Sequence, residues 1–206
     1  MGSVLAFRRR SSGAPDPAEE RALLDRCRAG DREAMGVVLA EHGPALELHI
    51  ARLIGPCPDV EDVLQLVFIA AIKAFPRFRG EARVKTWLTR IATHVAIDAL
   101  RSPARKRRHR HAYDFDAQPS GEAPPDEHSR ARQELGRLHG LLDELTPVRR
   151  VAFVLFAVEG RSIAEVAALT DSSKMATKSR IFWARRKLMG LARRDPVLAA
   201  RFEVES

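Results

Sequence analysis

Residues 101–128 interrupt an otherwise helical sequence, and this break constrains the fold more than any other feature. The first part, 101–111, carries six Lys or Arg residues and no acid. The second part, 112–128, carries five acids and no Lys or Arg, with Pro, Gly and Ser spread through it. Such a composition is typical of a linker, because it offers little apolar surface to bury. The sequence therefore predicts two helical modules joined by a flexible tether.

Helical periodicity on both sides of the break sets the boundaries of the two modules, and no strand pattern accompanies it. We expect an all-α fold with a first helical domain at 16–102, a flexible linker at 103–128 and a second helical domain at 129–195. Residues 1–15 are expected to be unstructured, and residues 196–206 are expected to form a C-terminal tail.

Capping residues, glycines and prolines divide each module into helices. In the first module we expect five helices, covering about 16–29, 31–43, 44–55, 59–75 and 86–101. In the second module Thr146-Pro147 begins a helix that Gly160 ends. Ser162 and Glu165 then form a capping box, in which each side chain bonds the other's backbone N–H. The last helix is expected from Lys174 to about Arg193.

Charge points to the class of partner. The 206 residues include 35 Lys or Arg and 27 Asp or Glu, a formal net charge of +8. A basic chain without an export signal or a long apolar segment favours nucleic acid as the partner and the cytoplasm as the compartment. Cys27 and Cys57 lie thirty residues apart without His or Cys at metal-ligand spacing, so neither a metal site nor a disulfide framework is expected, and no cofactor.

The segment 162–188 has the form of a helix-turn-helix. A short amphipathic helix, a polar turn and a longer helix match the geometry that places the second helix in a major groove. Residues 173–194 hold eight basic residues and no acid. An apolar set is expected to pack this helix on the preceding ones: Met175, Ile181, Trp183, Leu188 and Leu191.

The helix expected at 86–101 also has a polar face. Residues on that face recur at helical spacing and suit phosphates and base edges: Thr86, Arg90, Thr93, His94, Ile97 and Arg101. Leu88, Ile91, Val95 and Ala99 form the opposite, buried stripe. Just upstream, Phe75, Phe78 and Trp87 alternate with cations, a pattern that suits unstacked single-stranded bases. Phe75 is expected in the core, Phe78 on DNA, and Trp87 fits either role.

An acidic helix start precedes this region. Asp59, Glu61 and Asp62 either complement the helix dipole or dock on a basic protein partner, with Gln65 one turn further on.

Three segments resemble the bacterial RNA polymerase sigma factors of the extracytoplasmic-function (ECF) group, in the sigma-70 family, which keep only domains 2 and 4. The segments are 30–46, 59–101 and 145–188. The resemblance covers about residues 17–195 and implies a non-enzymatic factor that binds core polymerase, selects promoters and opens the −10 DNA. It also implies core RNA polymerase and promoter DNA as partners, with an anti-sigma factor as a further candidate.

The resemblance assigns residues to three surfaces. Core polymerase binding falls to Asp59, Glu61, Asp62 and Gln65. Single-stranded −10 DNA falls to Arg77, Phe78, Arg79, Lys85, Trp87, Arg90, His94 and Arg101. Duplex −35 DNA falls to Ser173, Lys174, Thr177, Lys178, Arg180 and Arg185.

Two departures from the family pattern bear on promoter choice. His94 stands where the family usually carries Asn, and the last helix begins with TDSSKMATKSR rather than the commoner Gly-Thr-Val form. Neither promoter element can therefore be inferred from relatives. The acidic half of the linker is expected to follow the path of RNA through polymerase or to act as a plain spacer.

Two other functions compete with this interpretation. A free-standing helix-turn-helix regulator would bind duplex DNA without polymerase, usually as a dimer. An enzyme acting on nucleic acid would need a catalytic motif, and no HExxH, GxxxxGK[ST] or GxSxG pattern is present.

Overall fold

The computed structural model describes residues 17–55, 59–102 and 136–195, and every regular element in these ranges is helical. An N-terminal group consists of α1 (Pro17–Arg28), α2 (Arg32–Ile54), α3 (Asp59–Ala74), the short 3-10 helix η1 (Phe75–Arg77) and α4 (Val84–Arg101). A C-terminal group consists of helical residues 136–143, α7 (Pro147–Ala157), α8 (Ile163–Leu169) and α9 (Lys174–Ala192). The prediction of an all-α chain is confirmed.

Several predictions fall outside the described residues. They concern the unstructured N-terminus 1–15, the tail 196–206, the linker 103–128 with its acidic half, the start of the second module at 129, and Cys57. These stay predictions.

The prediction of separate helices at 31–43 and 44–55 is wrong, because α2 runs through Pro44 without a break. An interior proline removes one helical hydrogen bond and costs about 3 kcal/mol. Burial on both sides of Pro44 offsets that cost: Met35, Val38 and Leu39 precede it, and Ile50 and Leu53 follow it, all in the core. Packing of the whole helix therefore overrides the local signal.

The predicted capping box and the cap at Ser173 are confirmed, whereas Thr146 makes no side-chain capping hydrogen bond and α7 ends at Ala157, before Gly160. Ser162 Oγ accepts from the Glu165 backbone N–H, and Glu165 Oε2 accepts from the Ser162 backbone N–H at 2.9 Å. Ser173 begins α9 by accepting from the Ala176 N–H at 3.1 Å. Asp171, in the turn between these helices, has a φ of 46°, a left-handed conformation that Asp adopts more readily than most residues.

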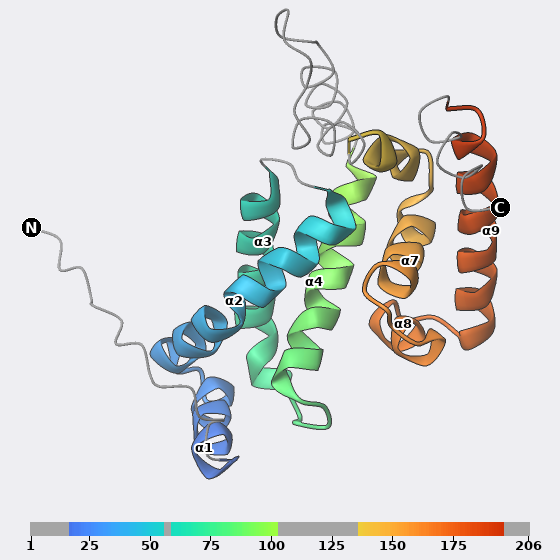
Figure 1. The fold of residues 1–206 in the computed structure, drawn as a ribbon. Coiled ribbons are helices and arrows are strands. Elements are labelled where there is room, and N and C mark those ends of the chain that lie inside the picture. The colour runs from blue at the N-terminus through green and yellow to red at the C-terminus, as the bar shows by residue number, and fades with distance from the viewer. Residues whose placement is uncertain (1–16, 56–58, 103–135, 196–206) are drawn as a thin grey trace, which may run out of the picture.

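The buried apolar residues form one continuous cluster that runs through both groups. Figure 1 shows α4 at the centre, with α2 and α3 on one side and α7 and α8 on the other. Both α4 and α2 pack against α7, and α4 also packs against α8. The side of α4 that faces away from its own group is therefore covered by the C-terminal group.

Candidate nucleic-acid interface

The polar face of α4 is only partly exposed. Arg90 and Arg101 are exposed and His94 is half-buried, but Thr93 is fully buried and Ile97 is 5% exposed. The prediction that Thr93 and Ile97 lie on a solvent face is therefore wrong in this structure. The physical reason is the packing of α7 and α8 against α4, which helical periodicity within α4 does not encode.

Two residues of this face, Arg90 and His94, contact the turn before α9. The Arg90 guanidinium forms a hydrogen-bonded ion pair with Asp171, and His94 Nε2 lies 3.0 Å from Asp171 Oδ2. Two residues predicted to contact −10 DNA thus share one carboxylate of the C-terminal group. Sequence reasoning treated Asp171 only as a turn residue.

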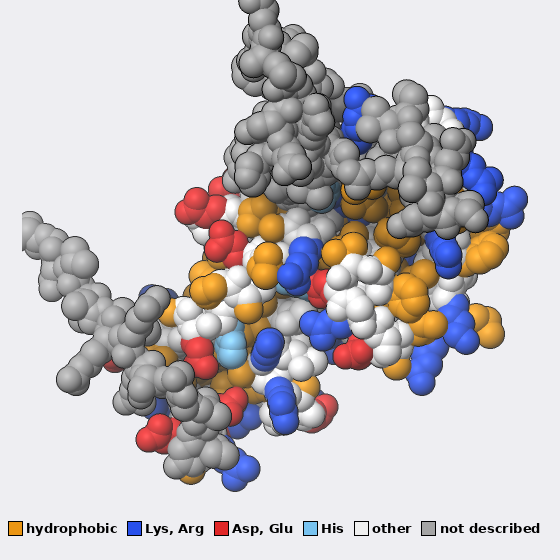
Figure 2. Space-filling model, viewed as in Figure 1, with side chains coloured by type: hydrophobic (Ala, Val, Ile, Leu, Met, Phe, Trp, Pro, Cys, Tyr) orange, Lys and Arg blue, Asp and Glu red, His pale blue; other side chains and the backbone are white. Residues whose placement is uncertain are grey.

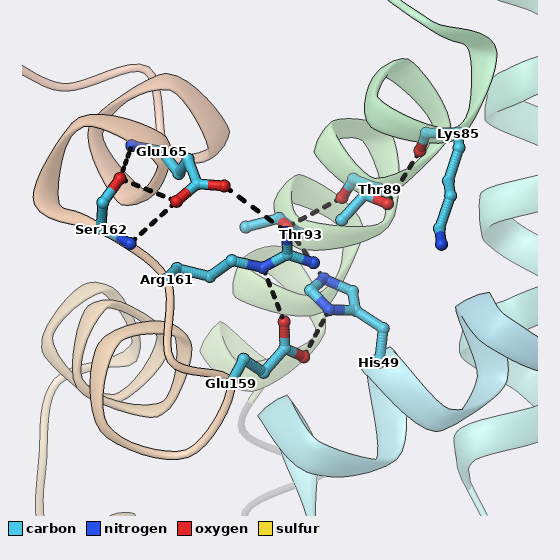
Figure 3. Close-up of polar contacts among 8 residues, drawn as sticks. All are labelled: His49, Lys85, Thr89, Thr93, Glu159, Arg161, Ser162 and Glu165. Carbon is cyan, nitrogen blue, oxygen red and sulfur yellow. Dashed lines mark hydrogen bonds and ion pairs between the residues drawn. The ribbon is translucent and has the colours of Figure 1, made fainter.

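A buried polar network also joins the two groups, between α2, α4 and the segment that follows α7 (Figure 3). His49 of α2 donates from Nδ1 to Glu159 Oε1 at 2.7 Å, and its Nε2 lies 3.0 Å from Thr93 Oγ1. The Thr93 hydroxyl also donates to Thr89 O at 2.8 Å, so each nitrogen of the His49 ring has a polar partner within the network. The network is therefore satisfied on the His49 side.

Glu159 is the charged member of the network and its side chain is 3% exposed. Burial acts to raise the pKa of Glu159, but the hydrogen bond and charge of His49, together with Arg161, hold it below its ordinary value. The Arg161 guanidinium reaches both Glu159, at 3.5 Å, and Glu165, at 3.7 Å. No sequence signal links His49 to Glu159, because 110 residues separate them.

A third contact between the groups comes from Arg150 of α7, which is fully buried. Its Nε donates to the Leu53 carbonyl at 2.8 Å, and its Nη1 pairs with Asp143. Leu53 lies in the last turn of α2, where backbone carbonyls lack helical partners. Arg150 therefore satisfies the end of an N-terminal helix from within the C-terminal group.

The loop before α4 holds its aromatic residues inward. Phe78 is 6% exposed. The centroid of its ring lies 4.7 Å from that of Trp87, and the Trp87 centroid lies 4.9 Å from that of Phe75. Arg28 of α1 stacks over Phe78 and donates from Nε to the Phe78 carbonyl at 2.7 Å. Phe75 is in the core, as expected. Stacking of Phe78 on an unpaired base requires this loop to rearrange.

The cations of the same loop are exposed. Arg77, Arg79 and Lys85 all face solvent, and Arg79 makes only a 3.8 Å contact with Glu81. Lys85 also lines a cavity of about 170 Å³ with Arg52 and His42, next to the polar network. Unlike the aromatic side chains of the loop, these cations are open to solvent.

Exposed cations lie along the outer side of α9. Lys174, Lys178 and Arg185 are exposed and Arg180 is partly exposed. Figure 2 shows Lys and Arg side chains gathered along the α9 side of the molecule. Ser173 caps the helix, whereas Thr177 is fully buried and bonds Ser172 Oγ at 2.8 Å.

The apolar set predicted to pack α9 on its neighbours is only partly right. Met175 is 81% exposed and Trp183 is 45% exposed, while Ile181 packs partly against the core. The inner face instead carries small residues, Thr177, Ala184 and Ala192, because α9 lies close to α7. Periodicity of large apolar residues missed these small contacts.

The start of α3 presents acids beside apolar side chains. Glu61, Asp62 and Gln65 are exposed, whereas Asp59 is buried at the first position of the helix. Leu66, Ile69 and Ile72 continue the same helix with exposed apolar side chains. Acidic side chains gather over this end of the helix in Figure 2. Sequence reasoning found the acids but missed the exposed apolar row.

Two searches bear on other kinds of site. Among the described residues, no group of three or more His, Cys, Asp or Glu residues is arranged to hold a metal ion. Within the same ranges, none of the helices has the length and hydropathy of a membrane span.

Family models match both groups of helices. Residues 39–107 match the model described as Sigma-70 region 2, and residues 135–188 match Sigma-70, region 4. These two matches cover more than half of the chain.

Curated relatives match over most of their length. The chain is 34% identical to the RNA polymerase sigma factor NccH of Alcaligenes xylosoxydans, over 88% of this chain and 99% of that protein. It is 34% identical to the sigma factor CarQ of Myxococcus xanthus, over 76% and 88%. It is 30% identical to the ECF sigma-E factor of Escherichia coli K12, over 81% and 90%.

Solved structures agree with these matches. CnrH in complex with the cytosolic domain of CnrY is similar with a TM-score of 0.56 and 30% identity, over 85% of this chain and 98% of that chain. The sigma factor RpoE of Bartonella quintana, in complex with the anti-sigma factor NepR, shares the fold at a TM-score of 0.53 and 24% identity, over 78% and 97%. The chain is therefore a sigma factor that directs RNA polymerase to promoters, not a free-standing regulator, and it belongs to the ECF group of the sigma-70 family.

Proposed function

We propose that the three surfaces divide the work of initiation: the start of α3 binds core polymerase, α4 with its loop opens and reads the −10 strand, and α9 reads the −35 duplex. The observation that carries this proposal is the separation of charge. Acids gather at the start of α3, and cations line the loop before α4 and the outer side of α9.

The polymerase surface combines charge with apolar area. Asp62 and Gln65 lie about one turn apart and exposed, and Leu66 and Ile69 lie next to them with about half of their surface exposed. A protein interface with an apolar centre and charged rim fits this arrangement better than a DNA contact does. Asp59 is buried at the first position of α3, where its charge complements the helix dipole and so supports the helix that carries this surface.

The −10 surface is proposed to consist of the loop cations and α4. Arg77, Arg79 and Lys85 neutralise backbone phosphates, while Arg90 and His94 reach bases or phosphates from α4, and Arg101 extends the cationic track. Phe78 and Trp87 supply rings for an unstacked base once the loop opens.

The −35 surface is proposed to be the N-terminal half of α9. This half of the helix begins at a capped N-terminus and carries three cations, Lys174, Lys178 and Arg180. A basic helix of this kind is suited to a major groove. Ser173 and Arg185 contact the flanking phosphates. Buried Thr177 supports the turn, because its hydroxyl bonds Ser172 and the Ser173 carbonyl.

Three further statements belong to this proposal. The chain acts in the cytoplasm, where core polymerase and promoter DNA lie. It performs no catalysis of its own, since polymerase supplies the chemistry. An anti-sigma factor regulates it, as the complexes of CnrH with CnrY and of RpoE with NepR suggest for their own sigma factors.

A gel-shift and transcription assay with host promoter DNA tests the division of work. The chain is expected to shift and transcribe promoter fragments only with core polymerase present. A matched control lacks the chain but keeps core. Tight promoter binding by the chain alone, with no transcription after core is added, would contradict the proposal.

A further inference from the structure

The contact between the two groups of helices covers the element that the proposed function assigns to −10 DNA. Thr93 and Ile97 on α4 are buried, and α7 and α8 both pack against this helix. The outer face of α9 stays exposed. One proposed DNA surface is therefore open and the other is occupied by the chain itself.

The occupant of that surface is anionic. Asp171 is 49% exposed; it pairs with Arg90 and lies 3.0 Å from His94 Nε2, so one carboxylate occupies two adjacent polar side chains of α4. A DNA phosphate offers the same chemistry, a compact anion with oxygens that accept charge-assisted hydrogen bonds. Asp171 and a −10 phosphate therefore compete for the same two side chains.

The interior of the contact holds the two groups together by other means. His49 links buried Glu159 to buried Thr93, and Arg150 donates to the Leu53 carbonyl. Apolar residues of α7 and α8, including Val151, Leu155 and Val166, join the same core as the N-terminal helices. These contacts fix Asp171 opposite Arg90 and His94.

We propose that this arrangement is a closed state of the free sigma factor in which Asp171 takes the place of a DNA phosphate on α4 and the His49–Glu159 pair holds the state shut. The proposal rests on the proposed role of α4 in −10 binding. Opening separates the groups, exposes Thr93 and releases Arg90 and His94 for DNA.

Substitution of Asp171 tests the competition directly. Asp171→Asn keeps a residue that tolerates the left-handed turn but removes the charge. Glu47→Gln is the matched control: it removes one exposed acid of α2 that makes no ion pair within the described ranges. Affinity of the full chain, without polymerase, for a mixed-sequence single-stranded oligonucleotide is measured by fluorescence anisotropy. We expect Asp171→Asn to bind about two- to fivefold more tightly than Glu47→Gln, the effect of losing exposed ion pairs.

A double-mutant cycle separates competition at α4 from a general charge effect. In an Arg90→Gln background, Asp171→Asn is expected to lose most of its effect on affinity, because the competing pair is already broken. An effect equal to that of Glu47→Gln, or one that is unchanged in the Arg90→Gln background, would overturn the role of Asp171.

Substitution of Glu159 tests the internal pair. Glu159→Ala leaves a buried His49 donor without an acceptor in the closed state, and opening restores its access to water. Small-angle X-ray scattering of the free chain is expected to show a larger radius of gyration for Glu159→Ala, and a value nearer to wild type for Glu159→Gln, which retains an acceptor. Circular dichroism confirms that helix content is retained.

Two outcomes decide the proposal. A folded Glu159→Ala chain with the wild-type scattering profile would overturn the closed state, and if that variant does not fold, the Asp171 experiment still decides. Failure of the wild-type chain to support transcription with core would instead overturn the proposed function. The scattering measurement does not use polymerase, so the two failures are distinguishable.

Discussion

The two helices that we propose to contact DNA, α4 and α9, are both basic, yet they differ in what packs against them. On α9 the buried residues are few and small, Thr177, Ala184 and Ala192, and the cations of its first turns face solvent. On α4 a second group of helices covers Thr93 and pairs with Arg90 and His94. Charge and periodicity alone do not distinguish such helices, because the difference lies in what packs against them.

Arg150 is the residue whose loss should damage the covered side most. Arg150→Met removes a fully buried guanidinium that bonds the Leu53 carbonyl and pairs with Asp143. We expect a loss of about 3 kcal/mol in the free energy of unfolding, at the low end for a broken buried ion pair because Asp143 is 35% exposed. Urea denaturation measures it, with Arg149→Met as the neighbouring control; equal losses in both variants would contradict this role.

A change at α3 tests a surface outside the comparison. Asp62→Arg reverses an exposed charge at the proposed polymerase surface, and like charges at an interface cost several kcal/mol. Affinity for core polymerase should fall at least tenfold, while helicity and −35 duplex binding stay at wild-type level. Biolayer interferometry with immobilised core measures the affinity, and Glu47→Gln serves as control. Wild-type affinity for core would remove Asp62 from this surface.

Changes on α9 test the open side. Lys178→Ala and Arg180→Ala should each weaken −35 duplex binding by holoenzyme. Loss of a base contact should cost about 1–3 kcal/mol at one base pair, whereas loss of a phosphate contact should act on all sequences and lower the salt slope by about one. Filter binding over a salt series separates the two results. Lys187→Ala, a cation further along α9, is the control. Unchanged binding in both variants would place the reading surface elsewhere.

Changes on α4 and its loop test the covered side. His94→Ala and Phe78→Leu should reduce opening of the −10 DNA by holoenzyme, since stacking on a base is worth about 1–3 kcal/mol. Leu is chosen at Phe78 because Ala would cost about 3–5 kcal/mol of stability at this buried site. Permanganate footprinting of a promoter measures opening. Wild-type reactivity in both variants would show that neither side chain acts on the opened strand.

Lowering the pH should weaken the contact between the two groups of helices, with a smaller effect than that of the substitutions above. The pKa of Glu159 is lowered from 4.5 in the folded chain: burial opposes this, but His49 and Arg161 outweigh it. The stabilising contribution of ionised Glu159 is therefore complete above pH 4.5 and is lost as the pH falls through its lowered pKa.

Other titratable or charged groups near Glu159 are His49, His42 and Arg52 of α2, Lys85 of α4 and the adjoining Arg161. The difference in unfolding free energy between the wild-type chain and Glu159→Gln isolates the contribution of Glu159 from theirs. Thermal melts from pH 6 to pH 3 should show this difference shrinking towards zero at the acidic end. A difference that stays constant with pH would show that folding does not lower the pKa of Glu159.

Local sequence signals located most helices of the described residues, but they did not indicate which helices pack together. The capping box at Ser162 and Glu165 and the cap at Ser173 depend on neighbours within three residues, and the structure confirms both. Pro44 misled the prediction because helix packing on both sides of it outweighs a lost hydrogen bond. His49 and Glu159 carry no pattern that links them, since only the folded arrangement of distant segments brings them to 2.7 Å.

Under the proposed closed state, the turn at Asp171 couples the helix that we propose to read the −35 element to the helix that we propose to read the −10 element. Its backbone shape orients α9, while its carboxylate meets α4. A chimera that imports the helix-turn-helix of another sigma factor, to change the −35 sequence it reads, replaces this residue as well. Such a graft should alter strand opening at −10, and restoring Asp at position 171 is the first correction to make.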